Sequence, residues 1–206
     1  MSAPAPGSTS FQAELRRYVH NKSVLFSPQI TCVVADVVGF ASAGLREGFR
    51  TALNRLTADA KVWPTRTFIE FCEAIVEHHT RDVRPAEQEL IGKSLFEAYI
   101  HFAGPQHAFE PPHKTLFMRS LRRRGPRGLA ASFLSLHLFN MVCIEICDNV
   151  ASKMEDRQSY ELYMFCVEAN CRDLVTRAME LPDGELDERW AAAIVNAIET
   201  QLFQVS

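Results

Sequence analysis

The sequence predicts an all-α fold, a bundle of roughly nine helices. Apolar residues recur every three or four positions along most of the chain, which places them on one face of a helix. Glycine–proline pairs such as Gly104-Pro105 and Gly125-Pro126 separate these segments, and such pairs commonly end helices. Hydrophobic residues make up 47% of the 206 residues, which is enough to fill a core without disulfides or a structural metal.

The N-terminal part of the chain is predicted to be a tail followed by helices. Residues 1–10 are small, polar and rich in proline, so we expect a disordered tail. Apolar side chains spaced three or four residues apart indicate a helix over Phe11–His20. Gln29–Ala43 is an apolar block whose β-branched residues fit a helix or a strand, and its helical neighbours favour a helix. These N-terminal helices occupy residues 11–43.

Two further helices are predicted before residue 80. Leu45–Leu56 is amphipathic, because its apolar residues return at helical spacing. The next helix begins near Pro64, where a neighbouring threonine can cap it, and it runs to about His79. Asp82–Pro85 then interrupts the helical pattern.

Two helices in the middle of the chain have clear end signals. Ala86–Phe102 carries apolar residues around one side, including Tyr99, and Gly104-Pro105 ends it. The helix His113–Arg124 is predicted to stop at Gly125-Pro126, because proline lacks the backbone donor that a helix interior needs. Both helices should therefore present one apolar face to a shared core.

The C-terminal part is predicted to contain the central buried helix. Leu129–Lys153 is apolar on most faces, so it is either one buried helix or two helices in series. Gln158–Met179 follows, and Pro182-Asp183-Gly184 is a turn signal. Residues 185–206 are predicted to hold an extra C-terminal helix, whose apolar residues recur every four positions: Leu186, Trp190, Ile194, Ile198 and Leu202.

Charge and cysteine content exclude several classes of protein. The net charge is −3 and the pI is near 6.2, so nothing global favours nucleic acid or an anionic membrane. The six cysteines contain no C-x-x-C pair, which indicates reduced, buried thiols in an intracellular protein. The most apolar window, Ile30–Ala43, contains Asp36 and is shorter than the roughly 20 apolar residues of a membrane span. The sequence therefore predicts a cytoplasmic protein without a transmembrane segment and without a nucleic-acid partner.

Four segments, taken in order, resemble the motifs of one family of helical domains. They are GLREGFRTAL at Gly44–Leu53, TFIEFC at Thr67–Cys72, KSLFEAYI at Lys93–Ile100 and MEDRQSYELY at Met154–Tyr163. Their order and separation resemble the RGS (regulator of G-protein signalling) family, whose members bind the α subunits (Gα) of heterotrimeric G proteins. The resemblance covers about residues 44–165 and implies an RGS-like helical domain over residues 44–180.

The resemblance also implies where a partner would bind. Members of the family accelerate GTP hydrolysis by holding the switch segments of Gα, without supplying a catalytic acid, base or metal. At the matching positions Thr67-Phe68 replaces a Glu-Asn pair and Ser120 replaces an Asn, and an additional apolar stretch near Leu129–Met141 precedes the closing motif. We therefore predict a protein-interaction domain for a Gα-type or other GTPase, with GTPase acceleration weakened or lost. The predicted partner-binding residues are Thr67, Phe68, Ser120, Arg119, Arg122, Arg123, Gln158 and Leu162.

Five arginines form a dense basic cluster: Arg119, Arg122, Arg123, Arg124 and Arg127. One interpretation is a contact with a phosphate-bearing ligand, an acidic protein or a membrane surface. The other is a solvated helix end whose cations complement the C-terminal helix dipole. Aromatic residues do not interleave with the arginines, which argues against a single-stranded nucleic-acid surface.

The remaining candidate residues do not predict an enzyme, a metal site or a cofactor. His101, His107 and His113 are six residues apart and His78 adjoins His79, whereas a zinc site on a helix uses histidines four residues apart. No glycine-rich phosphate loop and no Ser-His-Asp set is present in the sequence. The alternative to an interaction domain is an all-α sensory or ligand-binding domain that encloses haem or a lipid-like molecule.

Overall fold

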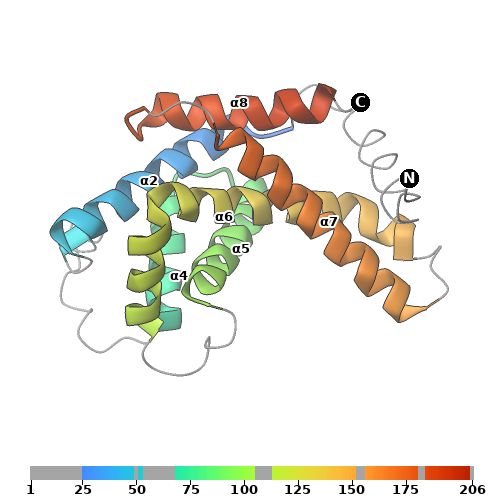
Figure 1. Cartoon of the computed structure of the whole chain (residues 1–206), viewed down its shortest axis with the longest axis horizontal. Coiled ribbons are helices and arrows are strands. Elements are labelled where there is room, and N and C mark those ends of the chain that lie inside the picture. The colour runs from blue at the N-terminus through green and yellow to red at the C-terminus, as the bar shows by residue number, and fades with distance from the viewer. Residues whose placement is uncertain are drawn as a thin grey trace.

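The computed structural model describes residues 25–48, 51–52, 68–104, 113–151, 156–180 and 184–204. Within these residues it contains helices and no strands, so the predicted all-α class is confirmed. The helices shown in Figure 1 are α2 (Pro28–Glu47), α4 (Phe68–Thr80), α5 (Pro85–Ala103), α6 (His113–Ala151), α7 (Arg157–Ala178) and α8 (Glu188–Gln204).

Some of the nine predicted helices lie in parts of the chain that the structure does not describe. The tail over residues 1–10, the helix over residues 11–20 and half of the helix over residues 45–56 lie outside the described residues. The described residues contain the six helices named above, and one of these, α6, combines two of the predicted nine.

Helix α2 is longer than the sequence indicated. Its start is capped by Ser27, whose Oγ accepts a hydrogen bond from the backbone N–H of Gln29 at 3.1 Å, and it ends at Gly48 with φ = 86°. The prediction that one helix ends at Ala43 and another begins at Leu45 is wrong, because the helix continues through the buried Gly44. Burial of the apolar face here outweighs the cost of glycine in a helix, about 1 kcal/mol.

Helices α4 and α5 pack against each other, and their connection is tied to α2. The side-chain Oε1 of Gln29 accepts a hydrogen bond from the backbone N–H of Arg84 at 2.9 Å, and its Nε2 donates to the carbonyl of Asp82 at 3.3 Å. Helix α5 then begins at Pro85, within one residue of the predicted start, and ends before Gly104, where φ = 113°.

Helix α6 contains a sharp kink at Gly125, where φ = 69° and ψ = 177°. Pro126 follows directly, and its ring and missing N–H prevent a straight continuation. The predicted break at this pair is confirmed, and the two helices predicted on either side of it are the two halves of α6. Figure 1 shows these halves running in different directions. The second half continues as one helix to Ala151.

The core forms where α6 packs against α5, α2 and α7. The Phe117 ring of α6 lies 5.5 Å from the Tyr99 ring and 5.7 Å from the Phe102 ring of α5, measured between centroids. The prediction of a central buried helix is confirmed by Phe133 and Leu134, which are fully buried. The largest fully buried side chains are Tyr99, Phe102, Phe117, Phe133, Ile30, Ile75, Ile91, Leu95, Leu121, Leu129, Leu134 and Leu138.

The C-terminal helix α8 covers part of this core, packing against α2 and α7. Trp190, Ile194 and Ile198 are buried, as the four-residue spacing predicted. A carboxylate oxygen of Glu199 also accepts the backbone N–H groups of Leu25 and Phe26, at 3.0 and 2.8 Å. These bonds fasten the segment before α2 to α8.

Two helices are long and apolar enough to cross a membrane by length and composition alone. They are Pro28–Glu47 and the segment Thr115–Ile144 of α6, with 44% and 50% of the apolar window buried. Core helices of soluble proteins pass the same test. The apolar window Ile30–Ala43 is thus part of a longer helix, and its short length no longer argues against a membrane span. The cytoplasmic location stays a prediction.

Candidate functional site

The predicted partner-binding residues lie on three helices. Thr67 is outside the described residues, and Phe68 is the first residue of α4, where only the backbone is described. On the first half of α6, Ser120 is half-buried, while Arg119, Arg122 and Arg123 are exposed. Gln158 and Leu162 are exposed on α7.

The structure does not bring the α6 and α7 residues of this set together. In Figure 1 the first half of α6 lies on the left and the start of α7 lies at the lower right, toward opposite ends of the longest axis. The second half of α6, from Pro126 to Ala151, spans roughly 40 Å at 1.5 Å per residue. The apolar stretch near Leu129–Met141 belongs to this half, so it carries the start of α7 away from Ser120.

The α7 residues lie beside exposed apolar side chains. Leu162 is 64% exposed, and Phe165, one helical turn further along α7, is 68% exposed. Ile144 of α6 is 65% exposed. Ile144 lies seven residues before the end of α6, and Phe165 lies eight residues after the start of α7. Because α7 is the next helix in the chain after α6, both residues lie about two helical turns from the connection between the two helices. We call Ile144, Leu162 and Phe165 the hairpin patch.

The start of α7 is fixed by a side-chain cap. The Asp156 carboxylate accepts hydrogen bonds from the backbone N–H and the hydroxyl of Ser159, at 2.7 and 2.8 Å. These hydrogen bonds lower the pKa of Asp156 below its ordinary value, so the cap stays ionised at neutral pH. The cap therefore fixes the residue at which α7 starts.

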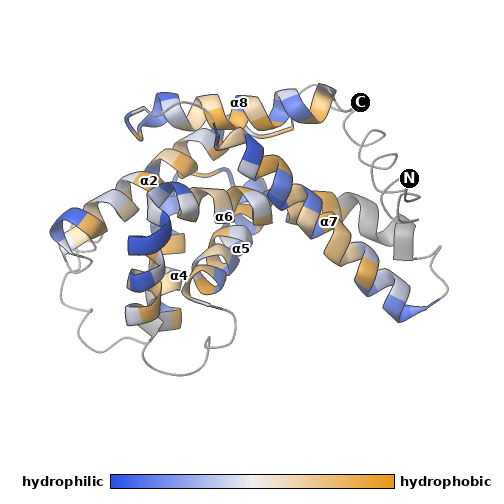
Figure 2. Cartoon of the chain, in the orientation of Figure 1, coloured by the Kyte–Doolittle hydropathy of each residue, from blue (hydrophilic) through white to orange (hydrophobic). Residues whose placement is uncertain are grey.

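Two members of the hairpin patch, Ile144 and Phe165, were not predicted from the sequence. Helix α7 carries apolar residues on two sides: Tyr163, Val167 and Cys171 form the buried stripe, and Leu162 and Phe165 lie off it. In Figure 2 hydrophobic colour lies along the lower half of α7, beyond its hydrophilic first turn. Leu162 and Phe165 are three residues apart, and residues at this spacing share a helix face. That spacing could have indicated a second apolar face on this helix.

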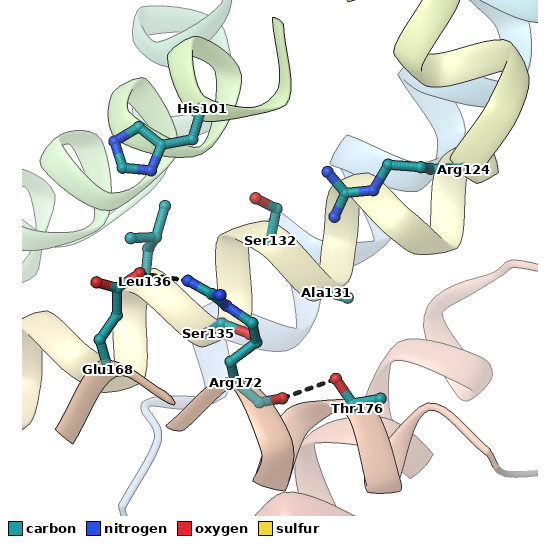
Figure 3. Close-up of a pocket in the computed structure, with 9 residues that line it drawn as sticks. All are labelled: His101, Arg124, Ala131, Ser132, Ser135, Leu136, Glu168, Arg172 and Thr176. Atoms are coloured by element: carbon teal, nitrogen blue, oxygen red, sulfur yellow. Dashed lines mark hydrogen bonds and ion pairs between the residues drawn. The ribbon is translucent and has the colours of Figure 1, made fainter. Parts of the chain in front are cut away.

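A second feature is a cleft between α5, α6 and α7, with a volume of about 350 Å³ and a lining of both polar and apolar groups. Figure 3 shows the Arg124 side chain reaching from the kink of α6 toward the space between the other two helices. The sequence analysis grouped Arg124 with its arginine neighbours and did not connect it to α7. The residues that line the cleft are His101, Arg124, Ala131, Ser132, Ser135, Leu136, Glu168, Arg172 and Thr176.

Arg124 is placed in the cleft by two glycines and a ring. The positive φ of Gly125 turns the chain immediately after Arg124. A Cβ on Gly128 would lie only 2.7 Å from the Arg124 Cβ, so a hydrogen is needed there. The guanidinium carbon lies 4.5 Å from the centroid of the Phe102 ring, a cation–π contact. Partial burial, followed by the like charges of Arg123 and Arg172, lowers the pKa of Arg124 below its ordinary value.

The opposite wall of the cleft comes from α7. Arg172 Nη2 lies 2.5 Å from a carboxylate oxygen of Glu168, one turn earlier on the same helix. The Thr176 hydroxyl donates to the carbonyl of Arg172 at 2.8 Å, and Figure 3 shows both contacts. Ser132 and Ser135 contribute hydroxyl groups from α6. The cleft therefore contains two guanidinium groups and one carboxylate.

No protein-family model, curated protein or solved structure matches this chain. The resemblance to RGS domains therefore rests on the four sequence motifs, and it stays a prediction. The hairpin patch and the cleft are features of the chain itself and do not depend on that resemblance.

The histidines are distributed over separate parts of the structure. His101 lines the cleft, His107 lies outside the described residues, and His79 and His137 are buried. Within the described ranges, no group of three His, Cys, Asp or Glu side chains is arranged to hold a metal ion. The alternative of a haem or lipid-like ligand stays a prediction from the sequence.

Proposed function

We propose that this chain is a helical protein-interaction domain that docks its partner through the hairpin patch. The observation that carries the proposal is the exposure of three large apolar side chains, each about two-thirds accessible, on adjacent helices. Large apolar side chains that are exposed on neighbouring helices favour burial against another protein. Leucine, isoleucine and phenylalanine also offer a partner well-packed anchors with little polar desolvation.

The surroundings of the hairpin patch fit an interface with an apolar centre and a polar rim. On one side Arg157 and Glu161 form an exposed ion pair at 2.7 Å, and on the other side Glu168 pairs with Arg172. These charges keep the rim solvated and contribute little to stability, because exposed pairs are worth about 0–1 kcal/mol. They are available to select the orientation of a partner.

The partner class that the motifs favour is a Gα-type GTPase. Gln158 and Leu162 are the matching positions around the closing motif, and both are exposed on α7, Leu162 as a member of the hairpin patch. Ser120 and the exposed arginines of α6 lie toward the other end of the molecule, and a serine cannot replace the amide of the family's asparagine. The proposal is therefore docking without acceleration of GTP hydrolysis, and without catalysis by this chain.

Replacing Leu162 and Phe165 by serine is expected to weaken partner binding by more than tenfold. Truncation of central apolar anchors typically costs 2 kcal/mol or more, about thirtyfold in Kd. The measurement is the Kd of Gα held in its transition-state mimic, with single-turnover GTP hydrolysis followed in parallel. Hydrolysis should keep its intrinsic rate when the wild-type domain is added.

The matched control is Leu45→Ser, which removes an exposed leucine from α2, far along the sequence from the hairpin patch. This variant should bind as tightly as the wild type. Equal weakening by Leu45→Ser would show that the effect is not local to the hairpin patch. Absence of binding to Gα in every nucleotide state would exclude the partner class, and an accelerated hydrolysis rate would contradict docking without acceleration.

A further inference from the structure

The cleft between α5, α6 and α7 presents hydrogen-bond donors that the protein itself does not satisfy. Arg124 forms no ion pair with any carboxylate of the described residues, and its contact is the face of the Phe102 ring. In the described part of the chain, the hydroxyls of Ser132 and Ser135 also have no hydrogen-bond partner. A cleft lined by spare donors fits a ligand that supplies acceptors.

The charges in the cleft favour an anion. Two guanidinium groups, Arg124 and Arg172, and one carboxylate, Glu168, line the cleft, and that carboxylate pairs with Arg172. One positive charge is therefore left without a partner. Burial is the largest cause of the lowered pKa of Arg124, and the like charges of Arg123 and Arg172 lower that pKa further. A bound anion would remove the repulsion.

The position of Arg124 is built into the backbone. Gly125 turns the chain, Gly128 leaves the space that the Arg124 Cβ needs, and Phe102 supports the guanidinium. A long side chain held in this way loses less conformational entropy on binding than a free surface arginine. Arg124 is exposed at the cleft, and these contacts make it a preorganised cation there.

We propose that this cleft binds a small phosphate monoester, with the guanidinium groups of Arg124 and Arg172 on the phosphate oxygens. A phosphate monoester offers three terminal oxygens, and arginine pairs with them through two parallel N–H groups. Ser132 and Ser135 supply further donors from α6. The cleft of about 350 Å³ lies at the lower end of the range of about 300–1,000 Å³ for small-molecule sites, which leaves room for a compact group on the phosphate.

The test is calorimetric titration of the full chain with ribose 5-phosphate, ribose and inorganic phosphate. Ribose 5-phosphate is expected to bind, ribose to give no binding heat, and inorganic phosphate to bind more weakly. Absence of ribose 5-phosphate binding at millimolar concentration would overturn the proposal. Equal affinity for inorganic phosphate would overturn the assignment of a monoester.

Two variants locate the binding. Arg124→Gln is expected to weaken the binding of ribose 5-phosphate by at least about tenfold, because it removes one charged hydrogen-bonding group. Arg122→Gln removes the same charge from the same turn of α6 at a position outside the cleft, and it should change the affinity by less than about twofold. Equal losses in both variants would indicate a diffuse surface charge and would overturn the site.

Gly128→Ala tests the placement of Arg124 without changing any charge. The added methyl group would lie 2.7 Å from the Arg124 Cβ, so that side chain must move. A loss of affinity comparable to that of Arg124→Gln is expected, with far-UV circular dichroism unchanged. Wild-type affinity in a folded Gly128→Ala protein would contradict the preorganised site, and Arg124→Gln decides the question if this variant unfolds.

Discussion

Truncation of Tyr99 to alanine is expected to lower the free energy of unfolding by about 3–5 kcal/mol. Tyr99 is fully buried in α5, and its ring centroid lies 5.5 Å from that of Phe117 in α6. Its hydroxyl oxygen lies 3.5 Å from Nε2 of His79 in α4. The Tyr99 side chain thus contacts three helices. Its truncation would leave a cavity between them, because no single helix can move to fill it without losing its other contacts. Denaturant titration at pH 7.5 measures the effect.

Two matched variants separate the ring from its hydroxyl and from the surface. Tyr99→Phe keeps the ring and removes a hydroxyl whose 3.5 Å contact is at the limit of a hydrogen bond, so its cost should be about 1 kcal/mol or less. Phe165→Ala removes an exposed ring and should cost less than about 0.5 kcal/mol. A loss below about 1 kcal/mol for Tyr99→Ala would mean that this position is not part of the core.

The parts of the fold that the sequence predicted are those governed by local chemistry. The helical spacing of apolar residues identified the buried face of α5, including Leu95 and Tyr99, and that of α8. The break at Gly125-Pro126 followed from the missing N–H of proline and the backbone freedom of glycine. In each case the deciding interaction lies within a few residues along the chain.

The errors arose where contacts between helices outweigh local preference. Gly44 looked like a helix boundary, yet α2 continues through it because that position is buried against the rest of the fold. Ser120 and residues at the start of α7 were assigned from the sequence to one set of partner-binding residues. The kink angle and the length of the second half of α6 separate them, and neither quantity is readable from a motif.

The candidate sites were predicted only in part. Leu162 was named from the sequence, but Phe165 was not, because α7 has apolar residues on two sides and periodicity does not say which side is buried. The cleft joins Arg124 and Arg172, which are far apart in the sequence. These two arginines line the same cleft because of the way α6 is bent and α7 is rotated. The spacing of residues along the sequence does not indicate either feature.

Acidification from pH 7.5 to pH 5 is expected to lower the free energy of unfolding by about 4 kcal/mol through two buried histidines. Burial lowers the pKa of His79 to about 3 and that of His137 to about 4, from an ordinary value of 6.5. The neighbouring His78 contributes to the shift of His79. Both side chains are therefore neutral in the folded protein at pH 5, whereas in the unfolded chain they are mostly protonated.

The sign of the effect follows from proton binding. Between about pH 4 and pH 6.5 the unfolded state binds more protons than the folded state, so stability rises with pH. The contribution is fully present above pH 6.5 and is lost as the pH falls toward the folded pKa values. Each histidine accounts for about 2 kcal/mol at pH 5, since one pKa unit corresponds to about 1.4 kcal/mol.

The surroundings of His137 explain why it stays neutral and how to test it. Its ring stacks on Phe26 and Phe133, with centroid distances of 6.1 and 5.7 Å, and its Nδ1 lies 3.2 Å from the Ser94 hydroxyl oxygen. A charged imidazole here would lose its hydration without gaining a carboxylate. His137→Gln replaces it by a side chain of similar size that does not titrate.

The quantity to compare between the wild type and His137→Gln is the difference in unfolding free energy between pH 7.5 and pH 5. The packing cost of the substitution is the same at both pH values, so it cancels in this difference. It should shrink by about 2 kcal/mol in His137→Gln, even if that variant is less stable at both pH values. The exposed Phe165 has no titratable group, so Phe165→Ala should leave the difference unchanged. An unchanged difference in His137→Gln would show that this imidazole becomes protonated in the folded state, and therefore that water reaches it.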